Sequence, residues 1–133
     1  MYLIDTNIWL ENLLDQDRAR EVKEFLNNVK SNRLYISDFA LHSIAIILTK
    51  LKKYDTFVKF LDDLFVDNMV NLVRLEPESV KNVLNVILQY NLDFDDAYQY
   101  VCAENYNLEI ISFDADFDKT KLSRKTPTEI KKM

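Results

Sequence analysis

The sequence predicts an α/β protein, an α/β/α sandwich with a central, mostly parallel sheet. Two observations indicate this class. Short apolar runs rich in β-prone residues recur along the chain, and amphipathic segments of about 10–15 residues with helical spacing separate them. A helical connection of that length returns the chain to the same sheet, so the strands that it joins are expected to run parallel.

The chain opens with a predicted strand followed by two helices. The run YLI at residues 2–4 predicts a short strand that ends at Asp5, and Thr6 is placed to cap a helix that continues to about Leu14. Apolar residues at helical spacing predict a second helix in the segment RAREVKEFLNNVK, residues 18–30.

The middle of the chain is expected to supply two more strands and two more helices. The run LYI at 34–36 predicts a strand, and Ser37 caps a very apolar helix that continues to about Lys50. Large apolar residues on one side predict an amphipathic helix at 54–67. The run VNLVRL at 70–75 predicts the third strand.

The last part of the chain is expected to form two helices and the final strand. A proline at the first position favours a helix over residues 77–90, because proline suits the first helical turn. In the segment 92–107, Asp93 is placed as the N-cap and Asp96 as the N3 residue of an acidic capping box. The run LEIIS at 108–112 predicts the fourth strand.

The composition is typical of one globular domain that spans residues 1–133. The chain is 48% hydrophobic and 29% charged. Its single cysteine, Cys102, excludes an internal disulfide, and one cysteine with one histidine, His42, cannot form a structural zinc site. The opening MYLIDTN lacks the pattern of a signal peptide, and the apolar run at 44–48 is too short for a membrane span. We therefore expect a soluble, cytoplasmic protein without a membrane partner.

The absence of glycine and the negative charge exclude two classes of function. Gly-rich phosphate-binding loops need backbone positions that only glycine fills without strain, and this chain has no glycine. A net charge of −5 argues against a protein that coats nucleic acid through basic side chains. It is compatible with an enzyme that holds cations between its own acids and a phosphodiester.

Three aspartates alternate in the segment ISFDADFDK, residues 111–119: Asp114, Asp116 and Asp118. Carboxylates this close raise each other's pKa unless a cation or hydrogen-bond donors balance their charge. An EF-hand loop is excluded, because its glycine and glutamate positions, counted from Asp114, hold lysines. The triplet alone therefore leaves two interpretations, a metal site and a solvated acidic loop.

Two more acids are placed to join this triplet. Asp5 and Asp114 lie just beyond the carboxyl ends of predicted strands, where open parallel sheets bind ligands. Asp96 lies in the first turn of the helix that leads into the last strand, and a right-handed crossover brings it to the same rim. We expect these three carboxylates to lie within roughly 8 Å of each other and to share one divalent cation.

Several motifs resemble a known family. LIDTNIWLE at the start, ISDFALHSIAIIL in the middle, and LDFDDAYQYVCA and LEIISFDADFDK before the ending TPTEI are similar to motifs of PIN-domain nucleases, in particular VapC-type toxins. The likeness covers essentially the whole chain. It implies a PIN-like fold and a small homodimeric endoribonuclease that hydrolyses RNA with Mg²⁺ or Mn²⁺. It also implies a cognate VapB-type antitoxin that holds the enzyme inactive.

The same resemblance assigns roles to individual residues. Asp5, Asp96 and Asp114 match the catalytic, metal-binding acids, and Ser112 matches the hydroxyl of the S/T-x-D element. Asp116 matches a more variable accessory metal ligand.

Neighbouring polar residues have a supporting role or a local one. Thr6 and Asn7 are placed to support Asp5 by hydrogen bonds, or only to begin a helix. Asp93 and Asp95 are expected to be local capping groups, and Asp118 a solvated loop acid.

One position departs from the family pattern. Where the family has a glutamate in a pattern like L-H-E-I, this chain has Ser43, which supplies no carboxylate. Three explanations are open: natural degeneration, a variant metal site completed by Asp38 or Asp116, and a deliberate change that tames a toxic protein, which the intact remainder favours. A competing function is therefore a catalytically inactive PIN-fold protein that binds an antitoxin or RNA.

The remaining clusters have ordinary structural interpretations. His42 and Ser43 are not a nucleophilic pair, because neighbours on a helix project about 100° apart, and we expect both to be buried, with Ser43 at the rim of the site. Six aromatic residues at helical spacing are expected in the core or an interface: Trp9, Phe25, Phe39, Phe57, Phe60 and Phe65. Six basic residues follow the last acid and are expected to form a solvated tail or to contact RNA: Lys119, Lys121, Arg124, Lys125, Lys131 and Lys132.

Overall fold

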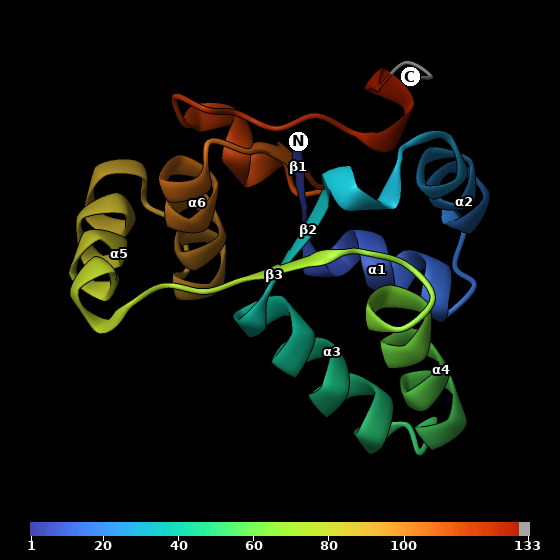
Figure 1. Cartoon of the computed structure of the whole chain (residues 1–133). Coiled ribbons are helices and arrows are strands. Elements are labelled where there is room, and N and C mark those ends of the chain that lie inside the picture. The colour runs from blue at the N-terminus through green and yellow to red at the C-terminus, as the bar shows by residue number, and fades with distance from the viewer. Residues whose placement is uncertain (131–133) are drawn as a thin grey trace.

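The computed structural model describes residues 1–130 and contains a four-stranded sheet in the order β3-β2-β1-β4 (Figure 1). Every strand pair is parallel. The predicted α/β class and the central parallel sheet are therefore confirmed. The strands are short and lie near their predicted places: β1 Tyr2–Ile4, β2 Leu34–Ser37, β3 Asn71–Val73 and β4 Glu109–Ile111.

Six α-helices connect and cover these strands (Figure 1). Their bounds are α1 Thr6–Leu13, α2 Ala19–Asn28, α3 Asp38–Lys50, α4 Tyr54–Phe65, α5 Pro77–Tyr90 and α6 Phe94–Tyr106. Three short 3-10 helices complete the described chain: η1 Ser31–Arg33, η2 Ala115–Lys119 and η3 Pro127–Glu129. No helix among residues 1–130 has the length and apolar character that crossing a membrane requires.

The two faces of the sheet support separate hydrophobic clusters, as an α/β/α sandwich requires. Tyr2 and Ile4 pack with apolar residues of α1 to α4, whereas Leu3, between them in the sequence, packs with α5 and α6. All three side chains are buried. This explains why the strand is a continuous apolar run, because a parallel sheet covered on both faces buries every side chain.

The helix starts confirm Ser37 and Asp93 as N-caps and the proline at the start of α5, whereas the cap at Thr6 and the acidic capping box are corrected. Ser37 Oγ accepts a hydrogen bond from the backbone N–H of Ala40 at 3.0 Å, and α5 begins at its proline. The N-cap of α1 is Asp5 rather than Thr6, because Asp5 keeps extended backbone angles and accepts from the N–H of Thr6. Asp93 is the N-cap of α6, but its side chain makes no capping hydrogen bond. The predicted acidic capping box therefore does not form.

The segment after η2 covers the outer edge of β4. The backbone N–H of Lys125 donates to Ile110 O at 2.8 Å, and the N–H of Ser112 donates to Lys125 O at 3.0 Å. Arg124 forms two hydrogen bonds with the carboxylate of Asp118, at 3.0 and 3.2 Å, and another with Ser112 O. The prediction of a solvated tail is therefore confirmed for the side chains of Lys119, Lys121 and Lys125, which are exposed, but not for the backbone, which pairs with the sheet, nor for Arg124, which is half-buried.

Four other predictions have mixed outcomes. Lys131 and Lys132 lie outside the described residues. Asp118 is exposed, as expected of a solvated loop acid, and is also paired with Arg124. His42 is exposed, contrary to the expectation of burial, because its side of α3 faces away from the core. Of the six aromatic residues, Trp9, Phe25 and Phe60 are buried in the core, Phe39 and Phe57 pack against core clusters, and Phe65 is 38% exposed.

Candidate functional site

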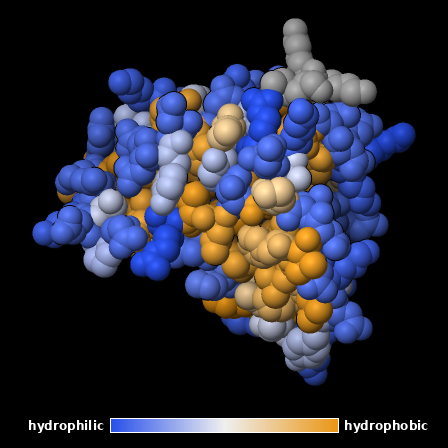
Figure 2. Space-filling model, in the orientation of Figure 1, coloured by the Kyte–Doolittle hydropathy of each residue, from blue (hydrophilic) through white to orange (hydrophobic). Residues whose placement is uncertain are grey.

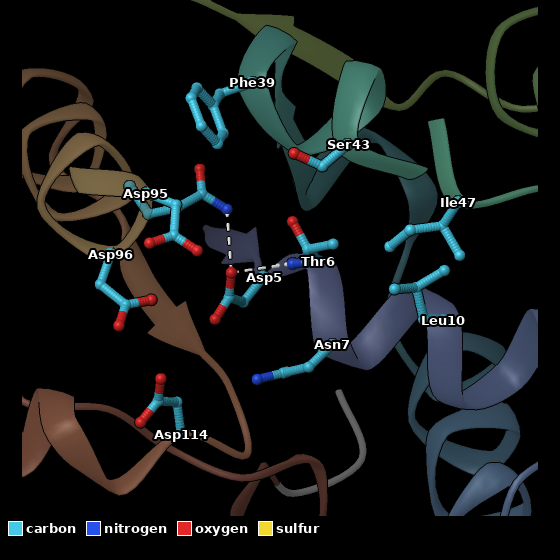
Figure 3. A pocket seen from close by; sticks show the side chains of 11 residues that line it. Asp5, Thr6, Asn7, Leu10, Phe39, Ser43, Ile47, Asp95, Asp96 and Asp114 are labelled. Atoms are coloured by element: carbon cyan, nitrogen blue, oxygen red, sulfur yellow. Dashed lines mark hydrogen bonds between the residues drawn. The ribbon is translucent and has the colours of Figure 1, made fainter. Parts of the chain in front are cut away.

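A cavity of about 370 Å³ lies at the carboxyl edge of the sheet, between α1, α3, α6 and the loop after β4 (Figure 3). Three predicted site acids line it: Asp5 directly after β1, Asp114 after β4, and Asp96 in the first turn of α6. They meet there because β1 and β4 are adjacent parallel strands, so their carboxyl ends lie side by side. Acids separated by most of the sequence thus share one cavity.

Asp5 is buried, and three donors fix its carboxylate. Oδ1 accepts from the N–H of Thr6 at 2.8 Å and from Nε2 of Gln99 at 3.1 Å, while Oδ2 accepts from Oγ of Ser112 at 2.7 Å. Burial raises the pKa of Asp5 above its ordinary value of 3.8, and these hydrogen bonds oppose that rise. The carboxylate is therefore held in one orientation in a water-poor position.

Ser112 links Asp5 to the loop that carries Asp114. Its Oγ accepts from the backbone N–H of Asp114 at 2.9 Å and from Nδ2 of Asn7 at 3.2 Å. Oδ1 of Asn7 in turn accepts from the N–H of Phe113 at 3.2 Å. Asn7 therefore supports Asp5 through Ser112 rather than directly, and Thr6 supports it through the backbone.

Asp96, Asp114 and Asp116 form a cluster of acids. Each offers a carboxylate oxygen within 4.8 Å of the others, although Asp116 is exposed and its own N–H donates to Asp114 Oδ1. Burial, together with repulsion from Asp114 and Asp5, raises the pKa of Asp96 to about 8. A carboxyl group in this condition lacks a positive charge nearby.

The residues at this edge suit a hard divalent cation. The available ligand atoms are carboxylate oxygens from separate elements, which is the donor type that Mg²⁺ and Mn²⁺ prefer. A cation would also remove the repulsion that raises the pKa of Asp96. The cluster of Asp96, Asp114 and Asp116 is consistent with a metal site, and Asp5 lines the same cavity as Asp96 and Asp114.

The sequence profile of the PIN domain matches residues 2–122. The chain belongs to the PIN domain family. No curated protein sequence shows significant similarity to this PIN domain.

Solved structures of toxins have the same fold as this PIN domain. A toxin–antitoxin complex from Klebsiella pneumoniae is 21% identical with a TM-score of 0.75, covering 96% of this chain and 98% of that one. VapC20 of Mycobacterium tuberculosis, a toxin that cleaves the sarcin–ricin loop, is 14% identical with a TM-score of 0.76, covering 89% and 93%. A structure of FitAB bound to an IR36 DNA fragment is 16% identical with a TM-score of 0.77, covering 98% of each chain. At these identities the likeness establishes the fold.

Ser43 lines the cavity of this PIN domain from α3, across from Asp114 (Figure 3). Asp38, at the start of the same helix, is committed elsewhere: its Oδ1 accepts from the hydroxyl of Tyr98 and from the N–H of Phe39, both at 2.8 Å. Neither Asp38 nor Asp116 lines the cavity, but Asp116 offers a carboxylate oxygen within 4.8 Å of those of Asp96 and Asp114. Of the two acids considered as substitutes for the missing carboxylate, Asp116 is the one that lies with the other acids.

Two cavity residues were missed or misjudged from the sequence. Asp95 lines the cavity and forms a second acidic group with Asp93 and Asp96. The sequence had indicated only a local capping role for Asp93 and Asp95. Gln99 was not considered at all. Its position three residues after Asp96 places it on the same helix face, and this spacing could have identified it.

Proposed function

We propose that this PIN domain is a metal-dependent endoribonuclease of the VapC toxin type, acting on cytoplasmic RNA. The observation that carries the proposal is the convergence of Asp5, Asp96 and Asp114 on one cavity at the carboxyl edge of the sheet. Membership of the PIN family and the toxin folds of the similar structures support it. We propose that residues 1–133 form one catalytic domain.

Asp5, Asp96 and Asp114 would hold Mg²⁺ or Mn²⁺ in this site, and Asp116 would contribute from the outer side. When bound, such a cation supplies an acidified water for attack on phosphorus and neutralises charge on the leaving oxygen. The chain itself contributes orientation. Gln99, Ser112 and the N–H of Thr6 hold Asp5 in place. The acids otherwise repel an RNA phosphate, so substrate binding depends on their neutralisation.

A cognate antitoxin is the proposed partner, and a groove of about 300 Å³ between α1, α2 and α4 is its proposed docking site. Trp9, Leu13, Leu26, Phe60 and Leu64 provide the apolar part of its wall. A groove of this kind suits the apolar face of an amphipathic helix. The toxin–antitoxin complex among the similar structures supports this partner class.

A homodimer is the proposed assembly. Large apolar residues are exposed on α3, α4 and α5, among them Ile46 (54%), Val58 (57%) and Leu88 (84%). Figure 2 shows an apolar surface over α3 and α4. Surfaces of this kind favour association. Light scattering at tens of micromolar tests the assembly, and a strict monomer would contradict it.

Ser43 favours a second candidate function, a catalytically inactive PIN-fold protein that binds an antitoxin or RNA. The serine leaves α3 without the acid that the family pattern has, so cation binding is expected to be weaker. The two candidates differ in one measurable property, metal-dependent turnover.

Cleavage of structured RNA with Mn²⁺, with Mg²⁺ and with EDTA distinguishes the candidates. A nuclease should cleave RNA only with a cation, and Asp96→Asn should abolish cleavage while preserving the fold. Asp62→Asn, on an exposed part of α4, is a charge-matched control that should cleave like the parent. If the chain binds RNA or antitoxin and cleaves nothing under any of these conditions, the binding protein is the correct function.

A further inference from the structure

Gln99 is a buried side chain with only one of its two polar ends satisfied. It is 2% exposed and lines the same cavity as Asp96. Its Nε2 donates to Asp5 Oδ1 at 3.1 Å, whereas its Oε1 has no hydrogen-bond partner. Among residues 1–130, this oxygen and Nε1 of Trp9 are the buried side-chain atoms in that condition.

The neighbouring carboxylate determines which end of the amide faces it. An ionised Asp5 only accepts hydrogen bonds, so the NH₂ group of Gln99 must face it. Exchanging the nitrogen and oxygen would place two acceptors against each other. The carbonyl is therefore committed to a position where no donor from residues 1–130 reaches it.

A buried carbonyl without a donor is unfavourable, and native proteins rarely leave one unpaired. The missing donor is expected to come from something that enters the cavity, because the nearby carboxylates of Asp5, Asp96 and Asp114 are acceptors when ionised. A hard divalent cation retains several waters, and each water brings donor hydrogens.

We propose that Gln99 is a positioning residue of the cation site, in which Nε2 holds Asp5 and Oε1 accepts a hydrogen bond from a water that hydrates the cation. The inference rests on the metal site of the proposed function. Ser43 strengthens it, because a hydroxyl in place of a carboxylate leaves more of the cation's coordination to water. Each of those waters needs an acceptor in the cavity wall, and Gln99 offers one.

Substitution of Gln99 by methionine tests the proposal, because methionine has a similar volume and no amide. Isothermal titration with Mn²⁺ alone should show roughly 10–100-fold weaker binding, the usual loss when a group that orients a metal ligand is removed. Urea unfolding in EDTA should show a metal-free variant of about the parent's stability, because removal of the unpaired carbonyl offsets the loss of the Nε2–Asp5 hydrogen bond. Gln89→Met, on the exposed face of α5, is the matched control and should change neither result.

A second variant separates the acceptor from the donor. Gln99→Glu keeps an oxygen at the end of the side chain and loses the NH₂ group, so Mn²⁺ should bind at least as tightly as to the parent. The metal-free protein should be less stable at neutral pH, because the new carboxylate faces Asp5. This variant decides the question if Gln99→Met does not fold, and Mn²⁺ affinity below the parent's would then overturn the proposal.

The outcomes distinguish this inference from the proposed function. Equal Mn²⁺ affinity of the parent and Gln99→Met overturns the inference. If the variant binds Mn²⁺ equally well but RNA less well, the inference is also overturned, and the carbonyl is assigned to an RNA hydroxyl. A parent that binds no Mn²⁺ overturns both the inference and the metal-dependent function. A parent that binds Mn²⁺ but cleaves no RNA overturns the nuclease alone, and the two affinities still decide the role of Gln99.

Discussion

Replacing Asp96 by asparagine should make the metal-free protein more resistant to high pH. Burial and the nearby Asp114 and Asp5 raise the pKa of Asp96 from 3.8 to about 8. The folded protein therefore binds a proton that the unfolded chain releases at about pH 4. The stability from this proton is fully present below pH 3.8 and is lost as the pH rises through about 8. Asparagine does not titrate, so the stability of the variant should not fall in this way as the pH rises.

The size of the effect follows from the same values. A tenfold difference in proton affinity is worth about 1.4 kcal/mol, so the full difference sets a ceiling of about 6 kcal/mol. Water entering the cavity and rearrangement of the acids reduce this figure, because effective protein dielectrics are far above that of a dry interior. We therefore expect Asp96→Asn to retain on the order of 2 kcal/mol more stability than the parent between pH 5 and pH 8.5.

Urea unfolding in EDTA at a series of pH values measures this difference directly. Asp62→Asn removes the same charge from an exposed part of α4 and should follow the parent curve. Saturating Mn²⁺ should restore the stability of the parent at pH 8.5, by about 2.7 kcal/mol at a hundredfold excess over the dissociation constant. It should have little effect on the stability of Asp96→Asn. Parallel pH curves for the parent and Asp96→Asn would refute the reasoning, because Asp96 would then not be crowded by its neighbours.

Three other predictions concern the cavity and its support. Ser43→Glu should tighten Mn²⁺ binding and raise RNA cleavage, and adding Asp96→Asn should abolish the gain; unchanged calorimetric affinity would show that the site is degenerate elsewhere. Ser112→Ala should lower the free energy of unfolding, measured in urea, by about 1–3 kcal/mol, because Asn7, Asp5 and the N–H of Asp114 each lose a hydrogen-bond partner. A loss below about 0.5 kcal/mol would contradict this. Phe117→Ala should cost about 3–5 kcal/mol in the same assay, since its buried ring anchors η2 beside the acids, and Phe65→Ala is the exposed control.

The fold was predictable because its local signals agree with its tertiary structure. The apolar run at 2–4 predicts β1 because both faces of the sheet are covered, so that every side chain of the strand is buried. Serine is a favoured N-cap residue, and Ser37 caps α3 through its hydroxyl. The strand predicted at 70–75 is reduced to β3, Asn71–Val73. Edge-strand length depends on the partner strand, which a single sequence does not specify.

The acids that share the cavity and the hydrogen-bonding neighbours Thr6, Asn7 and Ser112 were predictable from the sequence, but Gln99 was not predicted. The position of Asp5 and Asp114 after strands follows from sequence, because carboxyl ends of parallel strands share an edge. The three-residue spacing from Asp96 could have placed Gln99 on the cavity side of its helix, but the hydrogen bond to Asp5 and the unpaired oxygen depend on tertiary contacts that a spacing does not report. The pairing of Lys125 with the edge of β4 likewise depends on tertiary contacts that no local pattern encodes.

The order in which the cavity acids are synthesised has a consequence for the newborn chain. Asp5 follows the first strand, whereas its partner Ser112 and the acid Asp114 follow the last one, more than a hundred residues later. Lys125 then binds the edge of that last strand. Because β1 lies between β2 and β4, the cavity cannot close until β4 and the loop after it have been synthesised. A chain terminated before β4 would lack Asp114 and Asp116, so it could not assemble the acidic cluster.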